Sequence, residues 1–251
     1  MLAEDTVNHK ITVRYDGALY FGWQRLKDKP TLQGTIEATL ERVFGRPCPI
    51  TGSGRTDRGA HAQGQVFSVR LPGDKGIDVV KHELDEALPS TIGIVEMERV
   101  ADDFHALNSA SGKVYRYEIW NTPCCPAFRR DHAWHIPGAL AVASMRDACE
   151  IFVGERDFAS FATRPNFKQK STRRHVRRVD LVHDGPQITL TMEADGFLYK
   201  MVRNIVRAVV KVGEGRYELA ELRAIFDARD RRASPGTAPA RGLYLDAVRY
   251  G

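Results

Sequence analysis

The chain has 251 residues, of which 43% are apolar and 9% aromatic, so it is long enough to bury the core of one large or two small domains. This composition excludes a wholly disordered chain, and no run of roughly eighteen apolar residues predicts a membrane span. The net charge of +5 favours an anionic partner only mildly. Because the first residues are acidic and precede no apolar signal sequence, we expect a cytoplasmic protein.

The first half of the chain shows the periodicities of strands and helices in turn. Ile11, Val13 and Tyr15 are apolar at every second position, which is typical of a strand with one buried face. Apolar residues then recur at helical spacing between Thr31, which is suited to cap a helix, and Gly45, which is suited to end one. The predicted elements are a strand over 10–15, a helix over 31–45, a strand over 65–70, a helix over 77–88 and a strand over 94–100.

The second half contains the same two patterns without strict alternation. Its predicted elements are a strand over 113–121, a helix over 140–152, strands over 175–183 and 187–194 joined by a tight turn, helices over 197–212 and 218–228, and a strand over 243–250. Strands and helices mixed in this way indicate an α+β fold with helices packed on a sheet. We expect two related halves, over 1–108 and 109–251.

Four cysteines are present, and two of them are adjacent in the sequence. The positions of Cys48, Cys124, Cys125 and Cys149 include no Cys-x-x-Cys spacing, and adjacent cysteines suit a tetrahedral metal site poorly. A chain of this length also has no need of disulfides for stability. We therefore expect no metal site and reduced cysteines that pack as small hydrophobic side chains.

A glycine-rich loop over 52–59 contains the residues best suited to chemistry. Its sequence is Gly-Ser-Gly-Arg-Thr-Asp-Arg-Gly, which lacks the Gly-Lys-Ser/Thr of a phosphate-binding loop and the third glycine of a dinucleotide fingerprint. Asp57 lies between Arg55 and Arg58, whose charges favour the ionised carboxylate that a nucleophile requires. The alternative is a turn aspartate that hydrogen-bonds to its own backbone, and the local sequence leaves both open.

The excess positive charge is concentrated in one segment. No acidic residue lies between Asp157 and Asp180, whereas the rest of the chain sums to −2, because the total is +5 and the segment contributes +7. This distribution suits a phosphate-binding surface or a solvated basic face. Phe158, Phe161 and Phe167 lie in or beside the segment and could stack on unpaired bases. The seven cations are Arg164, Lys168, Lys170, Arg173, Arg174, Arg177 and Arg178.

Six stretches of the chain, in the same order, resemble the motifs of one enzyme family. Residues 54–62, Gly-Arg-Thr-Asp-Arg-Gly-Ala-His-Ala, are similar to the catalytic motif of the tRNA pseudouridine synthase A family. The other stretches are 15–17 with 20–25 (Tyr-Asp-Gly and Tyr-Phe-Gly-Trp-Gln-Arg), 102–106 (Asp-Asp-Phe-His-Ala), 115–117 (Tyr-Arg-Tyr), 197–206 (Phe-Leu-Tyr-Lys-Met-Val-Arg-Asn-Ile-Val) and 242–245 (Gly-Leu-Tyr-Leu).

The resemblance implies an isomerase that converts uridine to pseudouridine at positions 38, 39 and 40 of the tRNA anticodon arm. It also implies a homodimer and the pseudouridine synthase fold, a mostly antiparallel mixed sheet flanked by helices and built from two ferredoxin- or RRM-like halves. Because the reaction is an isomerisation, no redox or group-carrying cofactor is expected.

The family motifs also imply roles for individual residues. Asp57 is expected to be the nucleophile, which attacks C1′ or removes the C2′ proton, and Arg55 to help flip the target base. Tyr115 is expected to stack on the uracil, unless it packs in the core as an ordinary strand aromatic. Arg203 is expected to pair with Asp57, unless it is a helix-surface cation, and Leu243 to line the floor of the site.

Two regions are expected to contact RNA. The first is the loop over 102–106, where Phe104 and His105 match the family, but Leu107 follows where arginine is usual. The basic segment, with Arg164, Lys168, Lys170, Arg173 and Arg174, is therefore expected to contribute RNA contacts. Further departures from the family pattern are Arg58, Ala60 and Arg207.

Three other functions fit parts of the sequence. A non-catalytic RRM-like RNA-binding protein would share the strand and helix order, but its usual Lys/Arg-Gly-Phe-Gly-Phe strand is missing and it has no need of Asp57. A nucleoside or glycoside hydrolase would normally require a second catalytic carboxylate, and none stands out. A pseudouridine synthase with another tRNA site remains open.

Overall fold

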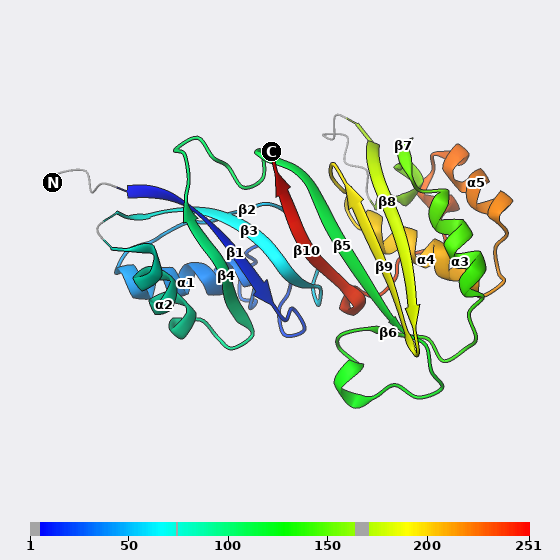
Figure 1. Cartoon of the computed structure of the whole chain (residues 1–251), viewed down its shortest axis with the longest axis horizontal. Helices are drawn as coiled ribbons and strands as arrows, with labels where there is room; N and C mark the ends of the chain where they lie inside the picture. The colour runs from blue at the N-terminus through cyan, green and yellow to red at the C-terminus, as the bar shows by residue number, and fades with distance from the viewer. Residues whose placement is uncertain (1–5, 74, 164–170) are drawn as a thin grey trace. The chain divides into compact units, whose positions relative to one another are not determined.

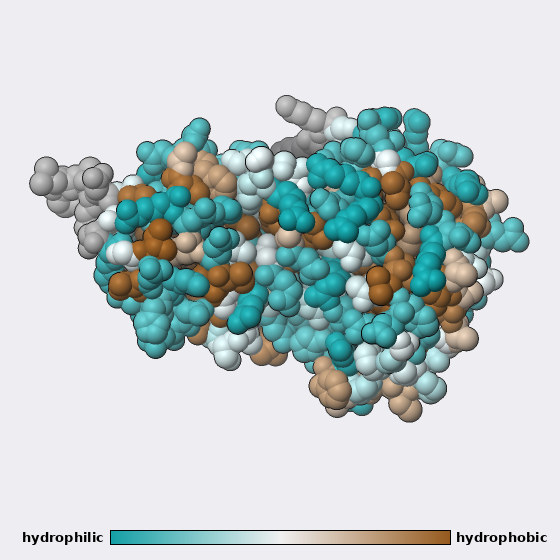
Figure 2. Space-filling view, in the orientation of Figure 1, coloured by the Kyte–Doolittle hydropathy of each residue, from teal (hydrophilic) through white to brown (hydrophobic). Residues whose placement is uncertain are grey.

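The computed structural model describes residues 6–73, 75–163 and 171–251, and the chain groups into two compact units. The first unit is Met1–Ser111 with Leu245–Gly251, and the second is Gly112–Tyr244. The chain therefore passes between the units inside two of its strands, β5 and β10. Among the described residues, no helix is long and apolar enough to cross a membrane. Figure 2 shows hydrophobic residues as separate patches on a mainly hydrophilic face.

The first unit is an antiparallel sheet with two helices (Figure 1). Strand β1 pairs with β3 on one side and with β4 on the other, and β2 pairs with β3. Side chains of α1, α2 and the three long strands meet in one apolar cluster, so both helices cover the same face of the sheet. The elements are β1 (Thr6–Tyr15), α1 (Leu32–Phe44), β2 (Thr51–Gly52), β3 (His61–Pro72), α2 (Ile77–Ala87), β4 (Ile92–Arg99) and the part of β10 (Leu243–Tyr250) that starts at Leu245.

The predicted elements of this unit are confirmed, and their local causes are visible. Ile11 and Val13 are fully buried on β1, as the alternation requires. Thr31 caps α1, since its hydroxyl accepts a hydrogen bond of 3.3 Å from the Gly34 N–H. Gly45 ends the helix with φ of 67°, a left-handed conformation that favours glycine.

Strand β3 begins four residues earlier than predicted. The sequence over 61–64, His-Ala-Gln-Gly, has little strand propensity. Pairing with β1 nevertheless extends the strand, and Tyr15 lies opposite Ala62 after an irregularity in the register. The extension matters because it starts β3 directly after the glycine-rich loop.

The second unit is also an antiparallel sheet with helices. Its strand order is β5-β9-β8-β7, and the short β6 pairs with β5 in parallel. Helix α3 packs against β8 and against α4. The elements are β5 (Ala110–Trp120, in this unit from Gly112), β6 (Trp134–His135), α3 (Val142–Glu150), β7 (Gly154–Asp157), β8 (Arg173–Asp184), β9 (Gln187–Ala194), α4 (Met201–Gly213), α5 (Leu219–Ala228) and the first two residues of β10. The α+β class with a mostly antiparallel sheet is confirmed.

Helix α4 starts at Met201 rather than at Phe197. Lys200 adopts φ of 60°, a left-handed conformation that a right-handed helix cannot contain, so the helix begins after it. Helix α5 has a cap that the sequence analysis missed, a reciprocal pair in which the side chains of Glu218 and Glu221 accept backbone N–H groups.

Two aromatic residues assigned to the basic segment do not face RNA. Phe158 and Phe161 are fully buried and join Phe152 and Phe226 in one cluster, with ring centroids 4.8 to 6.4 Å apart. The suggestion that they stack on bases was therefore wrong, because core packing uses both rings. Phe167 lies outside the described residues.

The cysteines are free, and only two of them match the expectation of buried hydrophobic residues. Cys48 and Cys149 are buried, and burial raises the pKa of both thiols, that of Cys149 to about 12. Cys124 is exposed and Cys125 is partly exposed. A thiol with a pKa this high stays protonated at neutral pH, so Cys149 is inert.

The cap of α1 is testable by substitution. Thr31→Ala removes the acceptor for the Gly34 N–H and should lower the free energy of unfolding by about 0.5–2 kcal/mol. Thr35→Ala, four residues into the same helix, should change it by less than about 0.5 kcal/mol, because alanine is a good helix former. Urea unfolding of both variants measures this, and equal midpoints would contradict the capping role.

Candidate active site

The glycine-rich loop over 52–59, here called the Asp57 loop, connects β2 to β3 in the first unit. Exposure alternates along its centre: Arg55 is exposed, Thr56 is buried and Asp57 is partly buried. Thr56 is therefore the buried residue between an exposed and a partly buried charged residue.

Thr56 is the point at which this loop is attached to the core. Its hydroxyl shares a hydrogen bond of 2.7 Å with the Tyr15 hydroxyl, in a buried position. Its carbonyl oxygen accepts a hydrogen bond of 3.1 Å from the Trp23 N–H. Both groups of Thr56 are thus held by the sequence 15–23, which matches the family's first motif.

A second attachment lies at the start of the loop. The Ser53 hydroxyl donates to Gln65 Oε1 at 2.7 Å, and Gln65 Nε2 donates to the Gly54 carbonyl oxygen at 3.1 Å. Ser53 and Gln65 are both fully buried, so leaving either without its partner would cost about 1–3 kcal/mol. These bonds fix the loop backbone two residues before Thr56.

Glycines let the backbone of residues 17–22 approach the loop closely. A Cβ atom on Gly22 would lie 2.8 Å from the Thr56 carbonyl oxygen, and Gly22 also has φ of 96°. A Cβ atom on Gly17 would overlap the carbonyl oxygen of Ala60. The first motif therefore supports the loop from behind, a role that the sequence analysis did not identify.

In the second unit, Tyr115 lies on β5 and is 8% exposed. Its ring packs edge-on against Phe197, with centroids 5.1 Å apart and an interplanar angle of 86°. Lys113 precedes it by two residues and projects from the same face of the strand. Burial lowers the pKa of the Lys113 ammonium. The Tyr115 ring is thus held against Phe197, on the same face of β5 as the Lys113 side chain.

Arg203 projects from the first turn of α4, also in the second unit. Its Nε donates to the Ala238 carbonyl oxygen at 2.7 Å, and the Ala238 N–H donates back to the Arg203 carbonyl oxygen at 3.0 Å. Leu243 follows a few residues later, at the start of β10, and is 6% exposed. The segment that leads to Leu243 is therefore tied to the helix that carries Arg203.

Asn204, the next residue of α4, is fully buried and was not predicted as a site residue. Its Nδ2 donates to the Phe161 carbonyl oxygen at 2.6 Å, while its Oδ1 accepts from the Thr237 hydroxyl at 2.6 Å and from Arg231 Nη2 at 3.3 Å. This network fixes the first turn of α4, which also carries Arg203. The available signal was an uncharged polar residue on the helix face that it shares with the apolar Met201 and Ala208.

The loop over 102–106 is tightly organised within the first unit. Phe104 packs against Tyr250, with ring centroids 5.1 Å apart. His105 Nδ1 accepts the backbone N–H groups of Leu107 and Asn108, each at 3.2 Å, so the proton of the neutral ring lies on Nε2. Leu107 itself is 49% exposed.

Acidic residues of neighbouring strands partly neutralise the basic segment. Arg173 contacts Glu155 of β7 at 3.0 Å, and Arg178 contacts Glu193 of β9 at 3.1 Å. Arg174 donates to the Ser171 carbonyl oxygen at 3.0 Å. A charge count along the sequence misses such pairing across strands. The predicted residues Arg164, Lys168 and Lys170 lie outside the described residues.

Two departures from the family pattern are accommodated by aromatic rings. The Arg58 guanidinium lies 4.1 Å from the ring centre of Phe21, and that of Arg207 lies 5.2 Å from the ring of Trp134. Both distances are typical of cation–π contacts, in which the face of the ring attracts the cation.

Comparison with known proteins decides the family. The family model described as tRNA pseudouridine synthase matches residues 11–107 and 148–251, which include Asp57, Arg203 and Leu243. The chain belongs to the tRNA pseudouridine synthase family. It is 39% identical over 244 residues to tRNA pseudouridine synthase A of Methylacidiphilum infernorum, covering 97% of this chain and 96% of that protein.

Other relatives agree with this assignment. tRNA pseudouridine synthase A of Thermodesulfovibrio yellowstonii is 36% identical over 253 residues, covering 97% of this chain and all of that protein. The protein of the same name from Bacillus sp. is 38% identical over 244 residues, with 97% and 99% covered. A solved archaeal box H/ACA Nop10–Cbf5 complex aligns at a TM-score of 0.37 and 12% identity, over 80% of this chain and 43% of that one, too low to add to the assignment.

The support behind the Asp57 loop is testable without an activity assay. Gly17→Ala places a methyl group against the Ala60 carbonyl and should lower the free energy of unfolding by about 1–3 kcal/mol. Gly76→Ala is the matched control, since no atom of the described residues lies within 4 Å of the added Cβ and the φ of Gly76 is −66°. It should shift stability by less than about 1 kcal/mol. Urea unfolding compares the two, and equal destabilisation would refute the close approach.

Proposed function

We propose that this protein converts uridine to pseudouridine in the anticodon arm of tRNA, at positions 38, 39 and 40, with Asp57 as the nucleophile. The single observation that supports the nucleophile is the loop geometry. Thr56 is bonded into the core on both its hydroxyl and its carbonyl, so the backbone that leads directly into the partly buried Asp57 is fixed. A carboxylate held on a rigid turn suits attack at one fixed atom, because it needs little reorganisation.

The reaction needs a carboxylate because the bond from ribose C1′ to uracil N1 must break before C1′ joins C5. The Asp57 carboxylate acts either by attacking the electron-poor C1′, as in retaining glycosidases, or by removing the C2′ proton to give a glycal. Once the bond from C1′ to C5 has formed, C5 loses its proton, and N1, freed from the ribose, gains one. No atom is added or lost overall, so the chemistry requires no oxidant or group donor.

The target uridine must leave its base stack, which costs a few kcal/mol. Arg55 is exposed, two residues before Asp57, so its guanidinium can fill the space that the base vacates. The roles proposed for Tyr115, Arg203 and Leu243 rest on their match to the family motifs. These roles are stacking on the uracil, compensating the charge of Asp57 and forming the floor.

The proposals on oligomeric state, location and RNA contacts also rest on the match to the family motifs. A homodimer that binds tRNA across both subunits, a cytoplasmic location and RNA contacts by Phe104 and His105 are proposed from the family resemblance. The orientation of His105 supports an RNA contact. Its Nδ1 accepts two backbone N–H groups, so its Nε2–H can donate to a phosphate or a base.

Asp57→Asn tests the nucleophile. The amide is nearly isosteric but not nucleophilic, so release of tritium from tRNA labelled at uridine C5 should stop, while tRNA binding stays within a few-fold of wild type. Asp147→Asn is the control, because Asp147 is exposed on α3, and it should retain full activity. Sequencing the wild-type product should locate pseudouridine at positions 38–40. Turnover by Asp57→Asn would rule out this nucleophile, and free uracil would indicate a hydrolase.

The basic segment has a separate test. Replacing Lys168, Lys170, Arg173 and Arg174 together by glutamine should weaken tRNA binding and reduce the dependence of log Kd on log salt by up to about 3, since each lost phosphate contact removes about 0.7–0.9. The pairing of Arg173 with Glu155 reduces the share of that residue. Titrations from low to high salt measure the slope, and an unchanged slope would contradict an RNA-binding role.

A further inference from the structure

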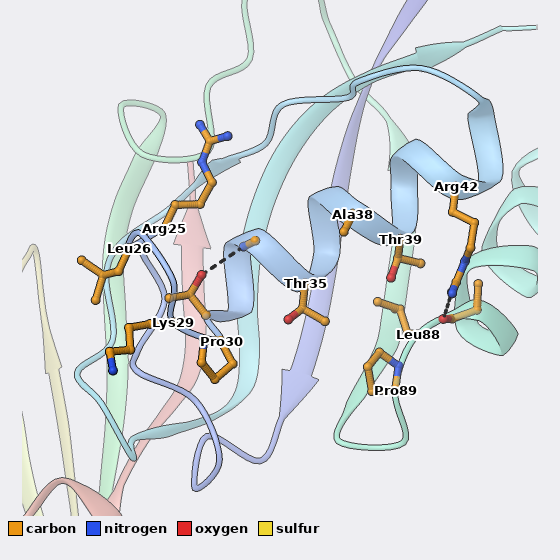
Figure 3. Close-up of a pocket in the computed structure, with 13 residues that line it drawn as sticks. Arg25, Leu26, Lys29, Pro30, Thr35, Ala38, Thr39, Arg42, Leu88 and Pro89 are labelled. Atoms are coloured by element: carbon orange, nitrogen blue, oxygen red, sulfur yellow. Dashed lines mark hydrogen bonds between the residues drawn. The ribbon is translucent and has the colours of Figure 1, made fainter.

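A groove of about 610 Å³ lies along helix α1 in the first unit (Figure 3). One wall is α1, one end is the exposed turn over 24–30, and Leu88 and Pro89 close the far side. Among the described residues, none of the Asp57 loop lines it. Its lining is formed by Arg25, Leu26, Lys29, Pro30, Thr31, Gly34, Thr35, Ala38, Thr39, Arg42, Ala87, Leu88 and Pro89.

The charged side chains of the groove are all cationic. Arg25 and Lys29 lie at the N-terminal end of α1 and Arg42 lies near its C-terminal end (Figure 3). Among the described residues, none that lines the groove is acidic. Arg25 is partly neutralised by Glu37, 3.2 Å away, so most of the available positive charge comes from Lys29 and Arg42.

Lys29 and Arg42 are supported by neutral groups rather than by acids. Arg42 Nη2 donates to the Ala87 carbonyl oxygen at 2.5 Å, which fixes its direction without cancelling its charge. The Lys29 ammonium lies 5.0 Å from the ring centre of Phe21. Both side chains therefore remain able to pair with an anion.

The helix terminus does not supply the anion site here. The N–H groups of Leu32 and Gln33 donate to the carbonyl oxygens of Gly22 and Trp23 at 3.1 and 2.9 Å. Those of Gly34 and Thr35 are bonded to Thr31. Since the first four N–H groups are occupied, an anion in the groove must be bound by side chains.

Phe21 connects the groove with the Asp57 loop inside one unit. Arg58 of the loop lies over its ring at 4.1 Å, and Lys29 of the groove lies over the same ring at 5.0 Å. The Phe21 N–H also donates to the Pro30 carbonyl oxygen at 2.8 Å, which closes the turn that carries Arg25 and Lys29. Cations therefore follow one another from the loop to the groove.

We propose that this groove binds the phosphate backbone of the substrate RNA on one side of the target nucleotide. Helix α1 has 13 residues, a length of about 20 Å, so cations near its two ends are far enough apart to contact different phosphates. Lys29 and Arg42 contact phosphates near the two ends, and the apolar side chains of Leu26 at one end and Leu88 on the far side accommodate sugars or a base face. The proposal rests on the proposed function in that the RNA is the substrate.

Salt-dependent binding tests the phosphate contacts. Lys29→Gln with Arg42→Gln should raise the Kd for full-length tRNA about tenfold or more at moderate salt and reduce the slope of log Kd against log salt by about 1.5. Lys81→Gln with Arg223→Gln removes the same charge outside the groove and should stay within twofold of wild type. Equal effects of both pairs, or none, would overturn the proposal. Because binding needs no chemistry, the outcome is independent of the Asp57→Asn assay.

A tethered probe locates the RNA directly. In a Cys124→Ser, Cys125→Ser background, Ala38→Cys carries an iron–EDTA group into the groove, and Ala224→Cys carries one on the exposed face of α5. Hydroxyl radicals from the first should cleave a short run of consecutive nucleotides in bound tRNA, and the second should leave that run intact. No cleavage from Ala38→Cys, or the same cleavage from both, would overturn the proposal and leave the groove to another kind of ligand.

Discussion

The hydrogen bonds of Thr56 are the interactions on which the proposed chemistry depends. Its side chain is bonded to Tyr15 on β1 and its carbonyl to Trp23, so the one buried residue between Arg55 and Asp57 is fixed at both polar groups. Without these bonds, a loop this rich in glycine could adopt many backbone conformations. The same attachment explains the two glycines behind the loop. Gly17 and Gly22 lack side chains where their backbone must approach the loop closely.

Much of the fold could be predicted because its local signals are strong. The alternation of Ile11, Val13 and Tyr15, the cap at Thr31 and the left-handed Gly45 each have one physical meaning, and the structure agrees with all three. The Asp57 loop was also recognisable, but its chemistry was not, since a turn aspartate has the same local sequence. Ordered motifs, rather than local composition, favoured the nucleophile. The site roles of Tyr115, Arg203 and Leu243 stay predictions.

What the sequence could not reveal depends on contacts across strands. Phe158 and Phe161 look like exposed aromatics among cations, yet tertiary packing buries both. Arg173 counts as a free charge along the chain, yet β7 brings Glu155 to it. The late start of α4 follows from the backbone conformation of Lys200, a residue type with no preference for it. Such contacts are set by register, which periodicity alone does not specify.

The division of β10 between the two units has a consequence for how the protein is made. Leu245–Gly251 completes the first unit, whose strand β3 otherwise keeps part of one edge unpaired. Domains generally fold as units while the chain emerges from its N-terminus. The first unit is therefore complete only once residues 245–251 have been synthesised, after all of the second unit. A chain released early would carry the Asp57 loop on an open sheet edge, which is a template for aggregation.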